Sequence, residues 1–412
     1  MNQINPQLLH EVLAVVQSSL LTPKTRTREK VEVILRSYFE SEAIVNQISW
    51  DRSIGTSVMR LYAQVESFAK DFAFSTLSKA VECNPDVSKC ALSRKELRRP
   101  ERTFWRFELY CNLFREQQKF PYGLERIEEK DQKQKFFNHF APFENEQLGC
   151  VHDFWYDQVS VAFNDVAAHD VEWATGNSKG EDPVRWVDDY DPVGVAYKQA
   201  LLSRGLAGIQ AIRNAQSYDD RYDILQGSSL GRPDEDYNFL FHGLEVEDDH
   251  PSNNAKLRDI SLVEVRSQVK APVAAENDDG PLEAWKWANA CHTARYHFEP
   301  GNYFFRQRAY VMWDSRRLSL WGLLSMLRRD TPEEWNHAHT AGRRTIIAQE
   351  KSIQERNKTY EQGGLGWWDI NDDTRLVFPS DRKYYLLWLE KRQRVQEDWG
   401  RLIKWGTREY DC

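Results

Sequence analysis

The sequence has no long hydrophobic run: none of its apolar stretches approaches the roughly 20 residues that a helix needs to span a bilayer. Its first residues carry neither the basic region nor the uninterrupted apolar region of a secretory signal. These absences exclude an integral membrane protein and predict a cytoplasmic one. In that compartment the six cysteines are expected to be reduced thiols.

Metal-binding cysteine pairs and the motifs of large enzyme classes are also missing. No two cysteines form a C-x-x-C pair, and the chain contains no G-x-S-x-G, G-x-x-x-x-G-K-[ST], G-x-G-x-x-G or H-E-x-x-H. We therefore expect neither a metal nor a cofactor. Cys150 and Cys111 could pair with His152 or His169, but neither lies in a nucleophile signature, so a buried structural role is favoured for both.

What the chain has in abundance is aromatic rings and charge. It holds 15 Trp, 17 Tyr and 20 Phe among 412 residues, and 55 Lys and Arg against 63 Asp and Glu, a net charge of -8. So many large rings exclude a disordered chain. Apolar residues recur mainly at helical spacing, without a series of alternating strands. We predict an all-α fold, a multi-helix globular assembly with long loops and no Rossmann-type sheet.

The apolar periodicity predicts a succession of helices, which cover residues 7–21, 28–48, 56–82, 93–118, 143–170, 192–215, 258–268, 282–294, 302–328, 331–361 and 382–404. Ser93 and Glu96 have the spacing of a capping box at the start of one of them. Pro100 predicts a break or kink there, with the main helix beginning at Glu101.

Segments rich in Asp, Gly, Pro and Asn predict loops at 174–190, 217–256 and 269–281. The longest divides the chain into an N-terminal helical region (1–216), an acidic loop (217–256) and a C-terminal helical region (257–412). One continuous domain is the alternative. The acidic loop could be a lid, although a solvated insertion is favoured.

A carboxylate lies on an apolar helix face in the first segment that could carry chemistry. Phe104, Phe107, Cys111 and Phe114 form a helical stripe, and Glu108 falls within it. A carboxylate there needs a partner or a raised pKa. Glu108 could be a general acid or base, or it could bind a cationic substrate. A core glutamate paired with an arginine is the favoured alternative.

The second segment sets polar residues among large apolar ones, as in a pocket wall. Glu146, Cys150 and Asp153 share one helical face. Asp165 and His169 are four residues apart, so the carboxylate could orient the imidazole. The alternative is an ordinary polar helix face with a His–Asp hydrogen bond. A second polar–aromatic wall, over residues 303–314, has a packed helix as its favoured alternative.

Basic residues cluster in spite of the acidic total. Arg98, Arg102 and Arg106 recur every four residues on one helix face, with Arg99 beside them. Such a stripe could neutralise phosphates, since the local field governs contacts. A charged helix face with internal ion pairs is an equally good interpretation. Duplex DNA is not expected as a partner, because no DNA-binding motif is present.

Several of these segments resemble a large group of filamentous-fungal proteins, mostly described as hypothetical or F-box-like. They are residues 106–114, 143–147, 150–153, 163–166 and 169–173. We take the arginine-containing cyclodipeptide synthases to belong to this group. Those enzymes take two aminoacyl-tRNAs, one charged with arginine, and release a cyclic dipeptide. The resemblance implies a tRNA-dependent cyclodipeptide synthase with arginyl-tRNA among its substrates.

No family motif assigns residue roles, so the assignment follows from side-chain chemistry. A base must deprotonate the attacking amine, and carboxylates would hold the arginine guanidinium. The catalytic candidates are His169, Asp165, Glu108 and His152. The substrate-binding candidates are Asp153, Glu172, Glu146, Asn164 and Tyr110. The tRNA-binding candidates are Arg98, Arg99, Arg102 and Arg106.

The alternative function is an F-box-like helical adaptor without catalysis. Residues 4–13 are faintly similar to the opening of an F-box, which would bind a Skp-type adaptor. They depart from it in having no Leu-Pro start, and a basic stretch at 24–30 stands where a second apolar helix would begin. On this hypothesis the polar segments form a structural network.

Overall fold

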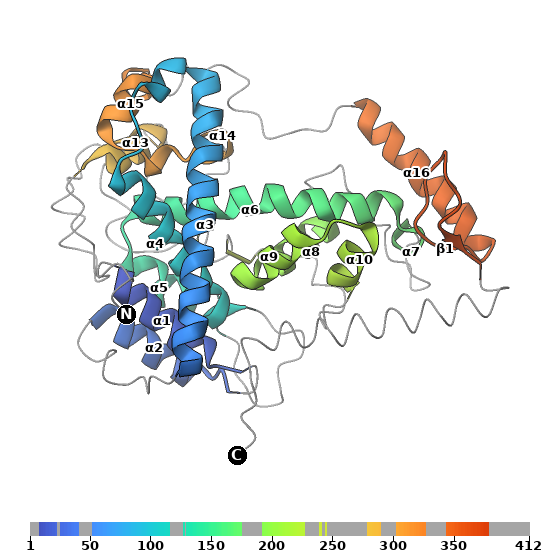
Figure 1. Cartoon of the computed structure of the whole chain (residues 1–412), viewed down its shortest axis with the longest axis horizontal. Helices are drawn as coiled ribbons and strands as arrows, with labels where there is room; N and C mark the ends of the chain where they lie inside the picture. The colour runs from blue at the N-terminus through green and yellow to red at the C-terminus, as the bar shows by residue number, and fades with distance from the viewer. Residues whose placement is uncertain are drawn as a thin grey trace. The chain divides into compact units, whose positions relative to one another are not determined.

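Helices make up nearly all of the regular secondary structure that the computed structural model describes (Figure 1). The described residues are 8–22, 25–40, 52–115, 127, 129–174, 192–226, 239–240, 244, 278–289, 302–326 and 343–378. In these ranges the only sheet is an antiparallel pair, β1 (Leu365–Gly366) and β2 (Leu376–Val377). The all-α prediction is confirmed. None of the described helices is both long and apolar enough to cross a bilayer.

The contacts of the chain group it into two compact units. Unit 1 consists of residues 1–154 and 239–338, and unit 2 of residues 155–238 and 339–412. Each unit therefore joins two distant stretches of sequence, which differs from the predicted division on either side of 217–256. Part of that predicted loop is helical, because α10 spans Tyr218–Gln226.

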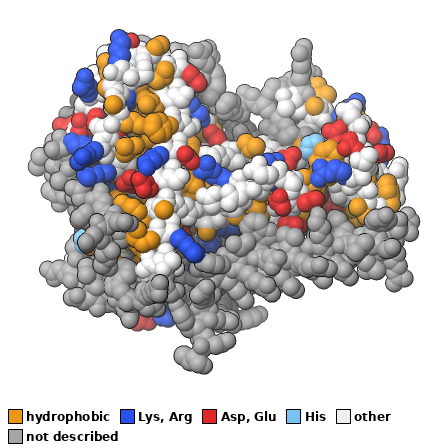
Figure 2. All heavy atoms as spheres, in the orientation of Figure 1, with side chains coloured by type: hydrophobic (Ala, Val, Ile, Leu, Met, Phe, Trp, Pro, Cys, Tyr) orange, Lys and Arg blue, Asp and Glu red, His pale blue; other side chains and the backbone are white. Residues whose placement is uncertain are grey.

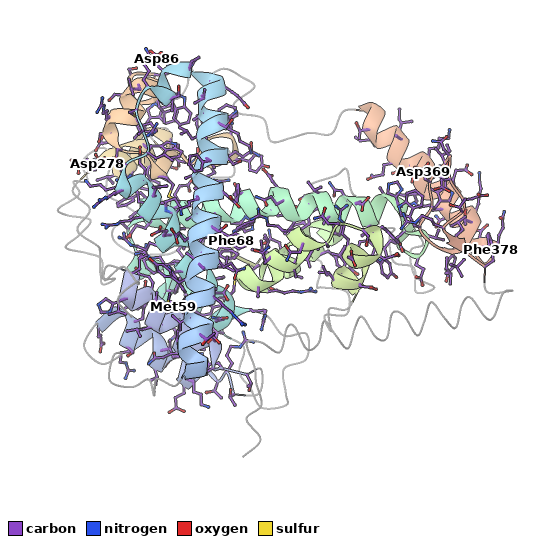
Figure 3. The ribbon with its side chains drawn as sticks, viewed as in Figure 1. Met59, Phe68, Asp86, Asp278, Asp369 and Phe378 are labelled. Atoms are coloured by element: carbon purple, nitrogen blue, oxygen red, sulfur yellow. The ribbon has the colours of Figure 1, made fainter. Side chains whose placement is uncertain are left out.

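Unit 1 is a helical assembly in which α4 is the central element. Its elements are α1 (Leu9–Ser19), α2 (Arg28–Glu40), α3 (Arg52–Cys83), η3 (Pro85–Lys89), α4 (Arg94–Phe114), α5 (Glu129–Lys135), η4 (Phe137–His139), the start of α6 (Pro142–His169), α13 (Gly280–Ala288), α14 (Tyr303–Arg306), η8 (Tyr310–Met312), α15 (Ser315–Trp321) and η9 (Leu323–Ser325). Helices α1 and α3 both pack on α4. Figure 3 labels Phe68 on α3, whose ring lies 6.2 Å from that of Phe104 on α4.

The start of α4 follows the predicted capping box. Ser93 Oγ accepts a hydrogen bond from Glu96 N at 3.1 Å, and Ser93 N donates to Glu96 Oε2 at 2.8 Å. The expected break at Pro100 is wrong, since α4 runs unbroken through it. Pro100 is buried in the helix interior, where packing outweighs the missing backbone donor.

Two predicted long helices are interrupted by residues with left-handed backbone. The described part of the helix predicted over 302–328 forms four short elements, α14, η8, α15 and η9. Ala309, at φ 49°, lies between α14 and η8, and Gly322, at φ 77°, follows α15. Residues 192–215 divide into α8 (Pro192–Leu202) and α9 (Gly205–Asn214), where Gly205 has φ 73°. A positive φ does not belong to a regular right-handed helix, so each of these residues lies where one helical element gives way to the next.

Unit 2 contains the rest of α6, followed by α7 (Val171–Ala174), α8, α9, α10, α16 (Arg343–Glu361) and the β1–β2 hairpin. Helix α16 packs on α7, and the hairpin segment meets the end of α6 through a bridge between Asp170 and Trp367. The predicted helices at 258–268 and 382–404 lie outside the described residues. So do residues 331–342 of the helix predicted over 331–361 and residues 175–190 of the loop predicted over 174–190.

Candidate functional site

The predicted polar face of α6 meets an arginine in the interior of unit 1. Arg306 Nε donates to Asp153 Oδ2 at 2.6 Å, and its Nη1 lies 3.4 Å from Glu146 Oε1. Tyr310 OH donates to the same Glu146 oxygen at 2.9 Å, and His152 Nδ1 lies 3.1 Å from Asp153 Oδ1. All five side chains are buried. We call this group the Arg306 cluster.

Burial and charge act in opposite directions on the two carboxylates. Burial opposes the ionisation of Asp153, but Arg306 and His152 outweigh it and hold the pKa of Asp153 below its usual range. Burial raises the pKa of Glu146, and Arg306 and Tyr310 offset this only in part. Burial also raises the pKa of the Cys150 thiol well above its usual value, so a structural role fits this cysteine.

A second buried cluster holds the predicted arginine stripe of α4. Arg106 Nη1 donates to Glu144 Oε1 at 2.8 Å, and the guanidinium lies 4.4 Å from the ring centre of Phe140. Glu11 on α1 lies 3.9 Å from Arg106 Nη2 and 3.7 Å from Arg102 Nε. The burial of Glu144 opposes its ionisation, but Arg106 and Arg102 outweigh it and lower its pKa. The contacts of Arg106 and Arg102 thus agree with the alternative interpretation of the stripe, a helix face with internal ion pairs.

A third cluster joins the start of α4 to the start of α15. Glu96 accepts two hydrogen bonds from Arg317, at 2.8 and 2.9 Å, and one from the backbone N–H of Asp314 at 3.1 Å. Arg99 Nη1 donates to Met312 O at 2.7 Å and lies 2.8 Å from Asp314 Oδ1. Asp278, labelled in Figure 3, accepts hydrogen bonds from the backbone and hydroxyl of Ser315.

These contacts correct the predicted tRNA surface. Arg99 and Arg106 are buried and bound to acceptors of their own chain, so neither can reach an RNA phosphate in this conformation. Arg98 and Arg102 are half-buried. The four-residue spacing follows one helix face, which is buried at Arg106 between Glu11 on α1 and Glu144 on α6 and is half-exposed at Arg98.

Two other candidates on α4 differ in burial. Glu108 is half-buried, so it is less enclosed than the apolar stripe predicts. Tyr110 is fully buried, and its hydroxyl donates to Gln132 Oε1 at 2.5 Å and lies 3.1 Å from the carbonyl oxygen of Phe239. Its ring packs against Phe137 in the interior. Tyr110 therefore belongs to the core rather than to a substrate surface.

The predicted pair of Asp165 and His169 in unit 2 does not form. Arg221 Nη1 on α10 donates to Asp165 Oδ2 at 2.7 Å. His169 Nδ1 instead lies 2.9 Å from the carbonyl oxygen of Trp368, and its ring stacks on Trp367 at 4.9 Å. Both partners come from segments far along the chain, which helical spacing alone does not reveal.

The other candidates of unit 2 are also on the end of α6 and on α7. Glu172 Oε2 accepts a hydrogen bond from Tyr222 OH at 3.1 Å. Asn164 is half-buried, and among the residues that the structure describes its Oδ1 has no hydrogen-bond partner. The sequence analysis missed Asp170, which is fully buried and accepts hydrogen bonds from Trp173 N at 2.8 Å and Tyr218 OH at 2.5 Å.

The structure thus brings Glu146, His152 and Asp153 together in unit 1, and it gives Asp165, His169 and Glu172 separate partners in unit 2. Within the described ranges no group of three or more His, Cys, Asp or Glu side chains is arranged to hold a metal ion. The missed partner in unit 1 is an arginine inside an apolar run. Arg306 follows two phenylalanines, and a charge in such a run signals a buried ion pair.

Comparison with known proteins adds no relative: no protein family, no curated protein and no solved structure matches the chain. The resemblance to the fungal F-box-like group therefore stays a prediction. So does the activity that this resemblance implies.

Proposed function

We propose that this chain is a helical binding module whose acidic and imidazole side chains stabilise the fold instead of acting on a substrate. One observation carries the proposal: Glu146 and Asp153, both candidates for holding a substrate guanidinium, already share the guanidinium of Arg306 in the interior of unit 1. A substrate arginine would have to displace a buried cation of the protein itself.

The surroundings of the candidate bases support the same proposal. A general base must lie within hydrogen-bond reach of the proton that it removes. His152 is buried next to Asp153, and His169 is engaged by the Trp368 carbonyl and stacked on Trp367. Each imidazole is therefore positioned as part of a packed network.

The partner that we propose for this binding module is a Skp-type adaptor that docks on the N-terminal helices. Residues 12–16 of α1 are buried in unit 1, so a partner has to use the outer faces of α1 and α2. Two apolar side chains are exposed there, Leu20 at 57% and Val33 at 53%. Exposed apolar side chains near a charged surface are suited to a protein partner.

The test is co-purification of the full chain with a Skp-type adaptor, followed by size-exclusion chromatography. The double variant Leu20→Glu/Val33→Glu is expected to abolish the complex. Val161→Glu is the matched control, because Val161 is 66% exposed but belongs to unit 2. Absence of a complex with the unaltered chain, or equal loss with the control, would contradict the proposal.

The tRNA-dependent cyclodipeptide synthase is the second candidate. One observation favours it: α4 presents Arg94 exposed and Arg98 half-exposed at its first turns, where an RNA phosphate could reach them. Figure 2 shows charges of both signs among apolar side chains on the visible face of unit 1. Incubation with aminoacylated tRNA and mass spectrometry for a cyclic dipeptide containing arginine distinguishes the two candidates. A product favours the enzyme.

A further inference from the structure

The Arg306 cluster places more negative than positive charge in a buried site. Glu146 and Asp153 contribute two carboxylates, and Arg306 contributes one permanently charged guanidinium. The contacts are unequal: Asp153 holds Arg306 at 2.6 Å, whereas Glu146 lies 3.4 Å from it. Two carboxylates that share one site do not both ionise readily, and the one with the weaker contact retains its proton.

The oxygen atoms of Glu146 are suited to such a proton. Both of its donors, Tyr310 OH and Arg306 Nη1, reach the same oxygen, Oε1. This leaves Oε2 as the oxygen that carries the proton. Burial raises the pKa of Glu146, in agreement with this arrangement, and the ionised Asp153 raises it further.

The titratable groups that act on Glu146 come from three elements of the described chain. Asp153 and Cys150 lie on α6 itself, Arg306 on α14 and Tyr310 on η8. His152 reaches the cluster through Asp153. Only Arg306 is a fixed cation, so nothing else in this set offers a permanent positive charge to an ionised Glu146.

We propose that the Arg306 cluster is a proton-binding latch, which fastens residues 303–312 to α6 when Glu146 is protonated and loosens them when that proton leaves. Outside the cluster, the segment is held by a hydrogen bond from Gln147 Nε2 on α6 to Val311 O at 2.9 Å and by one from Arg99 Nη1 on α4 to Met312 O at 2.7 Å. It consists of two short helices joined by Ala309, whose left-handed backbone (φ 49°) is unfavourable for a residue with a side chain. Arg306 and Tyr310 flank this residue, and both bind Glu146.

The direction of the effect follows from proton linkage. The closed state holds a proton on Glu146 at pH values where the opened state, with Glu146 in water, has lost it. Raising the pH through this window therefore favours opening, by up to about tenfold per pH unit for one proton. Above the pKa of Glu146 in the closed state, the dependence ends. The latch is a property of unit 1 and does not depend on the proposed partner.

The experiment is hydrogen–deuterium exchange of the full chain, followed by mass spectrometry from about pH 5 to 9, with exchange corrected for the intrinsic rate. In the unaltered protein, the opening constant of peptides from 303–312 is expected to rise with pH. Glu146→Gln resembles the protonated side chain, so its opening constant should stay level. Asp153→Asn removes the repulsion and should also abolish the rise.

A matched control is Glu101→Gln on α4. Burial also raises the pKa of Glu101, but its charged neighbours are Glu66, Arg98 and Lys70, outside the Arg306 cluster. The rise in the 303–312 peptides should persist in this variant. The same rise in Glu146→Gln as in the unaltered protein would overturn the proposal.

A second measurement covers the case in which Glu146→Gln does not fold. At pH values above the ordinary titration range of glutamate, infrared difference spectra of the Glu101→Gln variant should still contain the carbonyl band of a protonated carboxylic acid, because this variant retains Glu146. That band should disappear as the pH rises further. A folded protein without such a band over this range would overturn the latch.

Discussion

The buried pair of Arg306 and Asp153 and the partly exposed pair of Arg221 and Asp165 use the same chemistry in different surroundings. Their N–O distances are nearly equal, 2.6 and 2.7 Å. The first pair is at most 4% exposed, whereas the side chains of the second are 25% and 29% exposed. Distance therefore does not distinguish them, and burial does.

This difference in exposure indicates which ion pairs contribute most to stability. A buried pair that loses one partner leaves a charge without solvation, which costs several kcal/mol. A partly exposed pair is screened by water and contributes little. The buried pairs of unit 1 are therefore expected to contribute more to stability than the partly exposed pair of unit 2, and variants can test this contrast.

The largest expected effect comes from Arg306→Met, which leaves Asp153 and Glu146 buried without their cation. We expect a loss of about 3–5 kcal/mol in the free energy of unfolding of unit 1. Denaturant unfolding at neutral pH measures it, with Arg221→Met as the control in unit 2. A loss below about 1 kcal/mol would contradict the view that burial decides the energy.

The next effect concerns Glu144→Gln and has a pH dependence. At neutral pH the variant leaves Arg106 without its carboxylate, at a cost of about 3 kcal/mol. The pKa of Glu144 in the folded state is lowered, so its stabilisation is present above the unfolded value and is lost as the pH falls through the folded value. The stability difference between the unaltered protein and the variant should shrink on acidification. A constant difference would refute this assignment.

A smaller effect is expected for Ser93→Ala. The variant removes the N-cap acceptor of Glu96 N and the hydrogen bond from Ser93 Oγ to Asp314 Oδ2. The expected loss is about 1 kcal/mol in unfolding free energy, as for other helix caps. Ser93→Thr keeps the hydroxyl and should remain close to the unaltered protein. Equal losses in both variants would argue against the cap.

The smallest effect is expected for Asp165→Asn, which breaks only the partly exposed pair. We expect a loss of about 1 kcal/mol or less, and a smaller loss at high salt. A double-mutant cycle with Arg221→Met isolates the pair from other effects. A coupling energy as large as that of the buried pairs would remove the contrast between the two units.

Sequence patterns could predict the local features of this fold. The capping box at Ser93, the long helices α4 and α6, and the shared face of Glu146 and Asp153 all depend on residues within a few turns, and the structure bears them out. The partners could not be predicted in the same way. Arg306 lies 153 residues from Asp153, and Arg221 lies 56 residues from Asp165.

The partners of the arginine stripe could not be predicted for the same reason. An arginine stripe at four-residue spacing has the same appearance whether it faces water or a neighbouring helix, and only Glu144 and Glu11 reveal that Arg106 faces inward. Likewise, no residue next to Ala309 in the sequence indicates that Ala309 has a left-handed backbone conformation and interrupts the helix predicted over 302–328. Long-range packing decides both outcomes.

The carboxylate of Glu96 has a consequence for how the protein is made. It completes the capping box in the first turn of α4. Its other hydrogen-bond donors are Arg317 and the backbone N–H of Asp314, which are translated 221 and 218 residues later. Closing so long a loop is slow compared with local helix formation. On the ribosome, α4 with its local capping box can form first, and it then offers Glu96 as a docking point for α15, which arrives late in translation.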